Sequence, residues 1–266
     1  MNKLAVIGFG HMGSAIIEGA LGAGVVKPAD VAVADASAEN LGRANALGVK
    51  AVSDNREAVK GAETIIIAVK PNNLSELAAE IRECVKGAVI VSICAGKRIE
   101  TLKELFGEGA KIIRVMPNTP ALAGEGMAAL CRSENVCDDE MEYVLGIFRS
   151  FGKAEILKEE LFDTVTAVSG SGPAYVYAFI DGLMKYAVES GMTPEQAKIF
   201  SAQTVLGSAK LALMSEESPQ KLKENVCSPG GTTIEAVKVL DERGFEEIIR
   251  DAAKACEEKS RKLANA

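Results

Sequence analysis

The chain has 266 residues, 48% of them apolar, and a net charge of −7 without any run rich in lysine or arginine. This balance argues against nucleic acid or an anionic membrane as the main partner, and no segment approaches the roughly 18 consecutive apolar residues of a membrane span. The six cysteines form no C-x-x-C pair, and the single histidine, His11, is interpreted as a tolerated loop side chain. These counts argue against a metal site, a disulfide framework or a histidine-dependent nucleophilic triad, and they predict a cytoplasmic protein of two domains.

The chain opens on an apolar segment, residues 4–8, followed at once by the loop Gly8-Phe9-Gly10-His11-Met12-Gly13 and an apolar helical pattern. This is G-x-G-x-x-G between a strand and a helix, the setting that the dinucleotide fingerprint requires. Gly8 would permit the tight turn, Gly10 the approach of a pyrophosphate, and Gly13 close packing of helix on strand. The helix N-terminus attracts phosphate groups. We therefore predict a dinucleotide site, against the alternative of a turn that binds no ligand.

A second predicted strand, residues 31–34, ends on Asp35. An acidic side chain at this place accepts hydrogen bonds from the adenosine ribose hydroxyls, which suits NAD, and it repels a 2′-phosphate. Ser37 could nevertheless supply a donor close by. The alternative interpretation of Asp35 is a helix N-cap, for which Ser37 is at least as suitable. The ribose role is favoured, and the choice between NADH and NADPH stays open.

Short apolar segments alternate with amphipathic ones through the rest of the first half, which predicts a parallel sheet covered by helices. The segment 64–69 is β-branched nearly throughout, so we expect a central strand that ends on Lys70 and Pro71 at the ligand-binding edge. Lys70 either steadies the cofactor or is a solvated lysine at a strand end. Small residues after the next strand, among them Ala95, would let a nicotinamide ring lie close. Further strands are expected at residues 49–52, 88–92, 111–115, 127–131 and 153–157, and a helix at 139–148. Together these elements predict a doubly wound, Rossmann-type α/β domain over residues 1–160.

The second half, residues 161–266, shows helical periodicity and no convincing strand, which predicts an all-α domain. One apolar helix is expected at 174–190, and a capping box with proline at the first helical position opens another, which continues to about residue 214. A last helix is expected at about 245–263. Two long apolar helices expose more apolar surface than such a small domain buries alone. We therefore predict that this half forms a homodimer interface.

The turn Ser228-Pro229-Gly230-Gly231-Thr232-Thr233 precedes a helical pattern. Paired glycines expose backbone N–H groups, and the helix dipole attracts a carboxylate. An ordinary helix N-cap, the alternative, would need one Ser or Thr and no paired glycines. The turn is therefore predicted to bind a small anion, with Ser228, Gly230, Gly231, Thr232 and Thr233 as its residues.

Over essentially its whole length the chain resembles the pyrroline-5-carboxylate reductases. The resemblance rests on the segments 68–71, 114–120, 169–175 and 226–234, of which the last is the most specific. It implies reduction of the cyclic imine 1-pyrroline-5-carboxylate to L-proline with NADPH or NADH. It also implies an intertwined homodimer, which in this family often assembles into a ring of dimers.

The resemblance also implies roles for single residues. The substrate carboxylate would sit on the backbone of Gly231, Thr232 and Thr233, and the Thr233 hydroxyl, as the catalytic group, would reach the ring nitrogen. Glu216 resembles an auxiliary substrate-site residue, and Asn225 would lie near the nicotinamide. From fingerprint and resemblance together, the expected cofactor-binding residues are Ile7, Gly8, Phe9, Gly10, His11, Met12, Gly13, Asp35, Ser37, Asn55, Ala68, Val69, Lys70, Pro71, Ala95 and Asn225.

A protonated C=N bond is already a good electrophile, so this chemistry needs no nucleophile, metal or histidine. A β-hydroxyacid dehydrogenase is the nearest enzymatic rival. Such enzymes carry a catalytic lysine soon after a Gly-x-Gly, whereas here Gly170-Ser171-Gly172 is followed by Pro173 and no lysine before Lys185. Two further hypotheses stay open: an imine reductase with a different ring substrate, and a dinucleotide-binding protein that performs no chemistry.

Overall fold

The computed structural model describes residues 4–264. The chain forms two compact units, which we call the sheet unit and the helical unit. The sheet unit comprises the chain up to Ser171 together with the segment from Cys256 onward, and the helical unit is Gly172–Ala255. Each unit is described by itself below.

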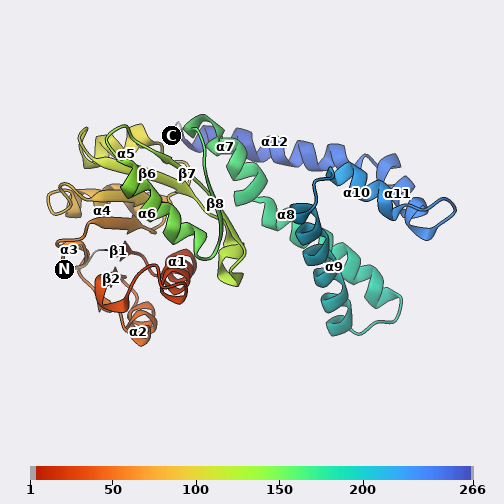
Figure 1. Ribbon diagram of the computed structural model, residues 1–266, viewed down its shortest axis with the longest axis horizontal. Helices are drawn as coiled ribbons and strands as arrows, with labels where there is room; N and C mark the ends of the chain where they lie inside the picture. Colours follow the sequence, from red (N-terminus) through yellow and green to blue (C-terminus); the bar gives the residue numbers. More distant parts are fainter. Residues whose placement is uncertain (1–3, 265–266) are drawn as a thin grey trace. The chain divides into compact units, whose positions relative to one another are not determined.

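The sheet unit is built on one eight-stranded sheet with the order β3-β2-β1-β4-β5-β6-β7-β8 (Figure 1). Neighbouring strands are parallel except for β6 and β7, which pair antiparallel. The strands are β1 Leu4–Ile7, β2 Val31–Ala34, β3 Lys50–Val52, β4 Thr64–Ile67, β5 Val89–Ser92, β6 Lys111–Met116, β7 Gly126–Arg132 and β8 Gly152–Ile156. The predicted doubly wound sheet is therefore confirmed, with β4 in a central place between β1 and β5.

Alternate residues of the central strands enter two different cores, one on each face of the sheet. Leu4 and Val6 of β1 pack in one core, whereas Ala5 and Ile7 pack in the other. Because both faces are covered, these strands are apolar without a break, as expected for parallel strands. The helices of this unit are α1 His11–Gly22, α2 Ala38–Ala46, α3 Asn55–Val59, α4 Leu74–Ile81, α5 Ile99–Phe106, α6 Asp138–Arg149 and α7 Phe162–Val165.

Helices α1, α2 and α6 cover the face that buries Leu4 and Val6, and α4 and α5 cover the opposite face. The observed bounds differ from the sequence-based ranges by at most two residues. The strand expected at 64–69 ends at Ile67. Ala68, Val69 and Lys70 therefore leave the sheet at its carboxyl edge, where they line a pocket described below.

The segment after β8 stays with the sheet unit through Ser171, beyond the boundary expected after residue 160. Phe162 is the reason, because its ring is fully buried against Ala129 and Cys131 of β7. A π-helical turn, η5 (Thr166–Gly170), follows α7. π-Helical turns are rare and frequently mark functional sites.

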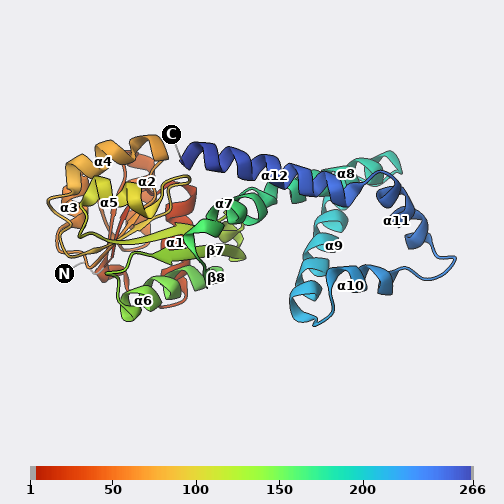
Figure 2. The same cartoon turned by 90° about the horizontal axis from the view of Figure 1, so that it is seen from above.

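The helical unit contains no strand among the described residues, as predicted. It comprises α8 (Gly172–Glu189), α9 (Pro194–Met214), α10 (Pro219–Val226), α11 (Thr232–Glu242) and the first half of α12 (Phe245–Ala264), which Figure 2 shows as one unbroken helix. The capping box of α9 is present: Thr193 Oγ1 accepts from the Gln196 backbone N–H at 3.2 Å, and Gln196 Oε1 accepts from the Thr193 N–H at 3.0 Å.

Within this chain, α8 and α9 bury little of their apolar surface. Not one residue of α8 is buried, and α9 buries only Ala197 and Ser201. Their exposed large apolar side chains are Val176, Tyr177, Phe179, Leu183, Tyr186, Val188, Ile199, Phe200, Leu206, Leu211, Leu213 and Met214. Monomeric proteins rarely expose a contiguous apolar surface of this extent, so these helices have the character of an interface.

Candidate active site

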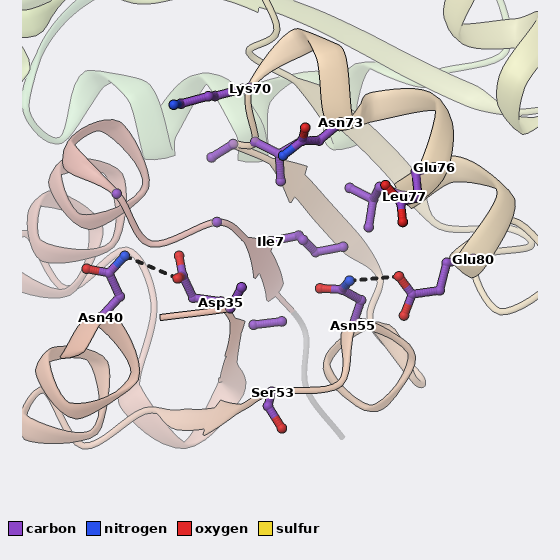
Figure 3. Close-up of a pocket in the computed structure, with 16 residues that line it drawn as sticks. Ile7, Asp35, Asn40, Ser53, Asn55, Lys70, Asn73, Glu76, Leu77 and Glu80 are labelled. Carbon is purple, nitrogen blue, oxygen red and sulfur yellow. Dashed lines mark hydrogen bonds between the residues drawn. The ribbon is translucent and has the colours of Figure 1, made fainter. Parts of the chain in front are cut away.

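A pocket of about 600 Å³ lies in the sheet unit where β1, β2 and β4 reach their carboxyl ends (Figure 3). The strand order reverses between β1 and β4, and open α/β sheets bind ligands at such a switch point. The pocket is lined by Ile7, Gly8, Gly10, Ala34, Asp35, Ala36, Asn40, Ser53, Asn55, Ala68, Val69, Lys70, Asn73, Glu76, Leu77 and Glu80. The structure thus brings together the predicted cofactor residues Ile7, Gly8, Gly10, Asp35, Asn55, Ala68, Val69 and Lys70.

The three glycines of the loop are required for different reasons. Gly8 has a φ of +97°, and a Cβ there would lie 2.6 Å from the Ala68 carbonyl oxygen. A Cβ at Gly13 would lie 2.0 Å from the Gly8 oxygen, so Gly13 permits α1 to pack on β1. Gly10, in contrast, has a negative φ, and no atom of the protein lies within 4 Å of its ideal Cβ. The protein itself would accommodate a side chain at Gly10, so the glycine leaves open space where it lines the pocket.

The amino end of α1 completes this cradle. Gly10 is the N-cap residue of α1, and no side chain caps the helix. The first N–H groups of such a helix have no intrahelical partner and carry partial positive charge. Backbone N–H groups in this arrangement bind phosphate oxygens, and Gly10 would let a pyrophosphate approach them. The residues present therefore fit the dinucleotide that the sequence predicts.

Asp35 lies directly after β2 and accepts hydrogen bonds from three groups. Its Oδ2 accepts from the Phe9 backbone N–H at 2.6 Å. Its Oδ1 accepts from the Ser37 N–H at 2.7 Å and from Asn40 Nδ2 at 3.1 Å. The carboxylate thereby fixes the glycine loop relative to the start of α2. The N-cap of α2 is Ser37, whose Oγ accepts from the Asn40 N–H at 3.4 Å, so the capping role falls to Ser37.

The α4 side of the pocket is acidic. Asn55 Nδ2 donates to Glu80 Oε2 at 2.8 Å, and Glu76 lines the same wall. At the β4 side, the Cys94 thiol donates to the Val69 carbonyl at 3.4 Å and so fixes the backbone beside Lys70. Burial raises the pKa of Cys94, which keeps the thiol protonated as a donor.

The other predicted cofactor residues do not line this pocket. Phe9 is fully buried in the core, Met12 packs against that core, and Gly13 serves helix packing. His11 is exposed at the first position of α1, and Ala95 is exposed after β5. The remaining three are Ser37 in its capping role, Pro71 at the start of a 3₁₀ turn, and Asn225 in the helical unit. Their cofactor roles stay predictions.

The predicted substrate residues all belong to the helical unit. Gly230 has a φ of +72°, which favours glycine, and a Cβ at Gly231 would lie 2.4 Å from Ser228 Oγ. Gly231 is the N-cap of α11, again without a side-chain cap, and Thr232 and Thr233 are the first two helical residues. The turn therefore presents uncapped N–H groups with two hydroxyls beside them. This arrangement suits a carboxylate.

Near this turn the structure shows one pair that the sequence did not predict. Asn225 Nδ2 donates to Glu217 Oε2 at 2.7 Å, so Glu217 orients Asn225, and Glu216 and Glu217 are both exposed. Both glutamates lie in the segment between α9 and α10, and the substrate-site role of Glu216 stays a prediction.

A second unpredicted feature joins two of the recognised segments. Asn118 Nδ2 donates to the carbonyl oxygen and to Oγ of Ser169, each at 3.2 Å, while Asn118 Oδ1 accepts from the Met127 N–H at 2.9 Å. The loop after β6 is thereby fixed to the π-helical turn η5. A Cβ at Gly170 would lie 2.4 Å from Met116 Cε. The asparagine within Met116-Pro117-Asn118 is the signal in the sequence that could have indicated this contact.

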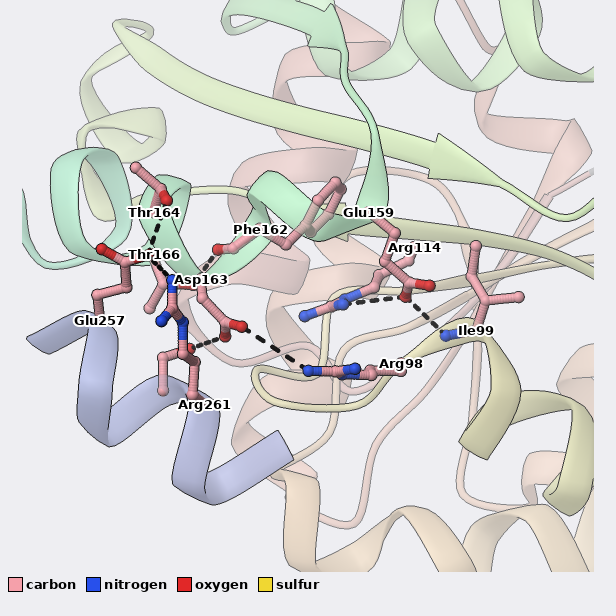
Figure 4. Close-up of polar contacts among 11 residues, drawn as sticks. Arg98, Ile99, Arg114, Glu159, Phe162, Asp163, Thr164, Thr166, Glu257 and Arg261 are labelled. Carbon is pink, nitrogen blue, oxygen red and sulfur yellow. Dashed lines mark hydrogen bonds and ion pairs between the residues drawn. The ribbon is translucent and has the colours of Figure 1, made fainter. Parts of the chain in front are cut away.

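Side-chain hydrogen bonds hold the end of α12 on the sheet unit, beside a network of ion pairs (Figure 4). Asp163 Oδ1 accepts from Ser260 Oγ at 2.6 Å, and Arg98 lies 3.9 Å from Asp163 Oδ2. Arg114, nearly buried, donates to Glu159 Oε1 at 3.0 Å and lies 4.6 Å from the centre of the Phe162 ring. The hydrogen bond of Ser260 with Asp163, and that which Thr164 Oγ1 donates to Glu257 Oε1 at 3.0 Å, join the segment from Cys256 onward to the sheet unit.

Across residues 4–264, no cluster of three or more His, Cys, Asp or Glu side chains could hold a metal ion. None of the helices within that range combines the length and the apolar character that spanning a membrane requires.

Comparisons with known proteins extend these observations to the whole chain. A family described as "Pyrroline-5-carboxylate reductase dimerisation" matches residues 159–263, and one described as "NADP oxidoreductase coenzyme F420-dependent" matches residues 3–96. The pyrroline-5-carboxylate reductase of Escherichia coli (strain K12) is 42% identical over 264 residues, covering 98% of each chain. That of Methanosarcina acetivorans is 35% identical over 263 residues, covering 98% of this chain and 97% of the relative.

Solved structures of the same family are similar to this chain over nearly its whole length. The pyrroline carboxylate reductase of Plasmodium falciparum, solved with NADP bound, is 35% identical with a TM-score of 0.90 and covers 98% of both chains. That of Coxiella burnetii is 30% identical with a TM-score of 0.92 and covers 99% of this chain and 98% of its own. Prephenate dehydrogenase of A. aeolicus, at 16% identity and a TM-score of 0.53, shares the fold alone.

Proposed function

Because the chain belongs to the pyrroline-5-carboxylate reductase family, we propose that it reduces 1-pyrroline-5-carboxylate to L-proline with NADH or NADPH. The observation within the structure that carries the proposal is the cradle at Gly10, which is open to a ligand and bounded by the uncapped end of α1. The turn Ser228–Thr233 also supports the proposal, because its N–H groups suit the carboxylate that this substrate carries.

The dinucleotide, when bound, supplies a hydride, which the imine carbon accepts while the ring nitrogen becomes an amine. The chain's own residues bind and orient. The loop Gly8–Gly13 and the α1 terminus hold the pyrophosphate, and Lys70 steadies the cofactor from the end of β4. The N–H groups of Gly231, Thr232 and Thr233 hold the substrate carboxylate, while the Thr233 hydroxyl hydrogen-bonds the ring nitrogen. Catalysis then rests mainly on orientation, since the protonated imine is already electrophilic.

The test is to follow oxidation of reduced nicotinamide by its absorbance, with purified protein and 1-pyrroline-5-carboxylate. Parallel reactions use a 2-keto acid, a 3-keto acid and a cyclic imine that lacks the carboxylate. We expect turnover with the first substrate alone. No oxidation with it would refute the proposal, and turnover of the imine without a carboxylate would refute the role of the Ser228–Thr233 turn.

The structure also argues against a β-hydroxyacid dehydrogenase. The first lysine after Gly172 is Lys185, and its ammonium group lies 2.6 Å from Asp181 Oδ2 on the exposed surface of α8. It is a surface ion pair, which argues against a catalytic lysine at that place. Turnover of a keto acid in the assay above would revive this possibility.

The helical unit matches a dimerisation family, so the chain self-associates. We propose the finer arrangement of an intertwined homodimer, assembling further into a ring of dimers, because α8 and α9 leave their apolar side chains exposed. Light scattering on the eluting protein tests this. Leu213→Glu is expected to yield monomers, whereas Leu122→Glu, at an exposed leucine of the sheet unit outside the dimerisation match, is the matched control and should leave the mass unchanged. A wild-type monomer would refute the arrangement.

A further inference from the structure

The pocket described above is acidic. Three of its lining side chains are carboxylates, Asp35, Glu76 and Glu80, and Lys70 is the single cationic side chain among the lining residues. Lys70 follows β4 whereas Asp35 follows β2, and β1 lies between these strands in the sheet. Strands are spaced about 4.8 Å apart, so the two side chains start from points roughly 10 Å apart. In Figure 3 the Lys70 ammonium group lies apart from the Asp35 carboxylate, so Lys70 does not neutralise Asp35.

Asp35 is held as an acceptor of hydrogen bonds. A carboxylate offers about four acceptor positions, two on each oxygen. Oδ1 uses both of its positions, for the Ser37 N–H and Asn40 Nδ2, while Oδ2 uses one for the Phe9 N–H. One position on Oδ2 remains. It can accept from a hydroxyl group, but it offers nothing to a phosphate, which itself only accepts once it is ionised.

The arginine of α2, Arg43, contacts groups other than Asp35. The Arg43 guanidinium lies 5.7 Å from the centre of the Phe9 ring and 3.7 Å from Glu18 Oε1, and Arg43 does not line the pocket. An arginine near the end of the second strand is the usual partner of a 2′-phosphate in this fold. In this chain the place beside Asp35 is filled instead by Asn40, whose amide already donates to the carboxylate.

We propose that Asp35 makes this enzyme select NADH over NADPH; this rests on the proposed function, since it presupposes that the pocket binds the dinucleotide. The ribose 2′-hydroxyl of NADH is a donor for the free position on Oδ2. The 2′-phosphate of NADPH carries between one and two negative charges near neutral pH and meets a fixed carboxylate without a counter-cation.

The test measures dissociation constants directly, by nicotinamide fluorescence, for NADH and NADPH with the wild-type dimer and with Asp35→Ser. We expect NADPH to bind about 10- to 100-fold more weakly than NADH to the wild type, the size of one close like-charge contact. In Asp35→Ser the ratio of the two constants should fall to about one. Because the substitution also removes the acceptor for the Phe9 N–H, both affinities will drop, and only their ratio reports selectivity. Should Asp35→Ser fail to fold, Asp35→Asn keeps one acceptor oxygen and serves the same purpose.

Two further measurements distinguish a local effect of Asp35 from the general negative charge of the pocket. Glu76→Gln removes a charge from the α4 wall of the same pocket and should change the ratio by less than about threefold, because the effect is local to Asp35. Raising salt from about 0.1 M to about 1 M shortens the Debye length from about 10 Å to about 3 Å, so the wild-type ratio should fall while that of Asp35→Ser stays constant.

Wild-type binding of NADPH as tight as or tighter than that of NADH would overturn the inference and leave the proposed function standing. A ratio unchanged by Asp35→Ser would overturn it equally. Failure of both dinucleotides to bind would instead overturn the proposed function.

Discussion

Gly10 and Gly13 lie three residues apart in one loop, yet the structure predicts opposite consequences for the same methyl group. At Gly13 the new Cβ would lie 2.0 Å from the backbone oxygen of Gly8, where ordinary contact begins at 3.4 Å. Neither atom is the end of a flexible side chain, so α1 must move away from β1. Overpacking costs about 1–3 kcal/mol, and a backbone clash belongs at the upper end. With about 2–4 °C per kcal/mol for a chain of this size, Gly13→Ala should lower Tm by about 6–12 °C.

At Gly10 the same methyl group meets no protein atom within 4 Å, and φ is −70°. The cost is that of alanine at an N-cap, below about 1 kcal/mol, or at most about 4 °C in Tm. The methyl group instead occupies the space that a pyrophosphate needs. We expect Gly10→Ala to weaken dinucleotide binding by about 5- to 150-fold, the equivalent of 1–3 kcal/mol of overpacking.

Scanning calorimetry and fluorescence titration with NADH measure the two effects. Gly42→Ala is the matched control, because Gly42 lies exposed within α2 with nothing near its Cβ. It should raise stability by about 0.5–1 kcal/mol and leave binding unchanged. Wild-type affinity in Gly10→Ala, or an equal loss of Tm in Gly10→Ala and Gly13→Ala, would refute the assignment of Gly10 to ligand approach.

Three other predictions concern catalysis, the core and the thiols. Thr233→Ala should lower kcat by about 10- to 1,000-fold with little change in NADH affinity, as for loss of one hydrogen-bond donor, whereas Thr233→Ser should retain most of the rate; an unchanged kcat in Thr233→Ala would remove its catalytic role. Arg114→Met should cost about 3 kcal/mol in urea denaturation, because it leaves the Glu159 carboxylate without its buried partner. The exposed pair of Arg132 and Asp138 is its control, and Arg132→Met should cost less than about 1 kcal/mol. Burial, together with nearby Glu159, raises the pKa of Cys131 to about 12, so at about pH 8 iodoacetamide should alkylate the exposed Cys84 and Cys137 but reach Cys131 only after unfolding; rapid native labelling of Cys131 would contradict this.

The local features of this protein were readable from the sequence because their causes lie within a few residues. Strand β4 is β-branched, the capping box of α9 spans Thr193 to Gln196, and the φ of +97° at Gly8 follows from the turn it makes. The loop Gly8–Gly13 and the turn Ser228–Thr233 were identified in the same way. Periodicity, caps and positive φ are properties of short segments.

Only the tertiary structure decided which distant residues come together. Nothing in the sequence near Glu76 or Glu80 marks them as pocket residues, because they reach it only when α4 packs on the sheet. The antiparallel pairing of β7 with β6, and the attachment of the end of α12 through Asp163 and Ser260, likewise depend on contacts between distant parts of the chain.

Asp35 shows both what the sequence determines and what the fold determines. Its place after the second strand was enough to predict an acceptor near a ribose. Only the fold showed that three N–H groups already occupy most of its acceptor positions and that Arg43 is turned to Phe9 and Glu18. A residue's chemical type and its local turn are set by sequence. The hydrogen-bond positions it has left and the charges around it depend on which distant residues the packed sheet brings beside it.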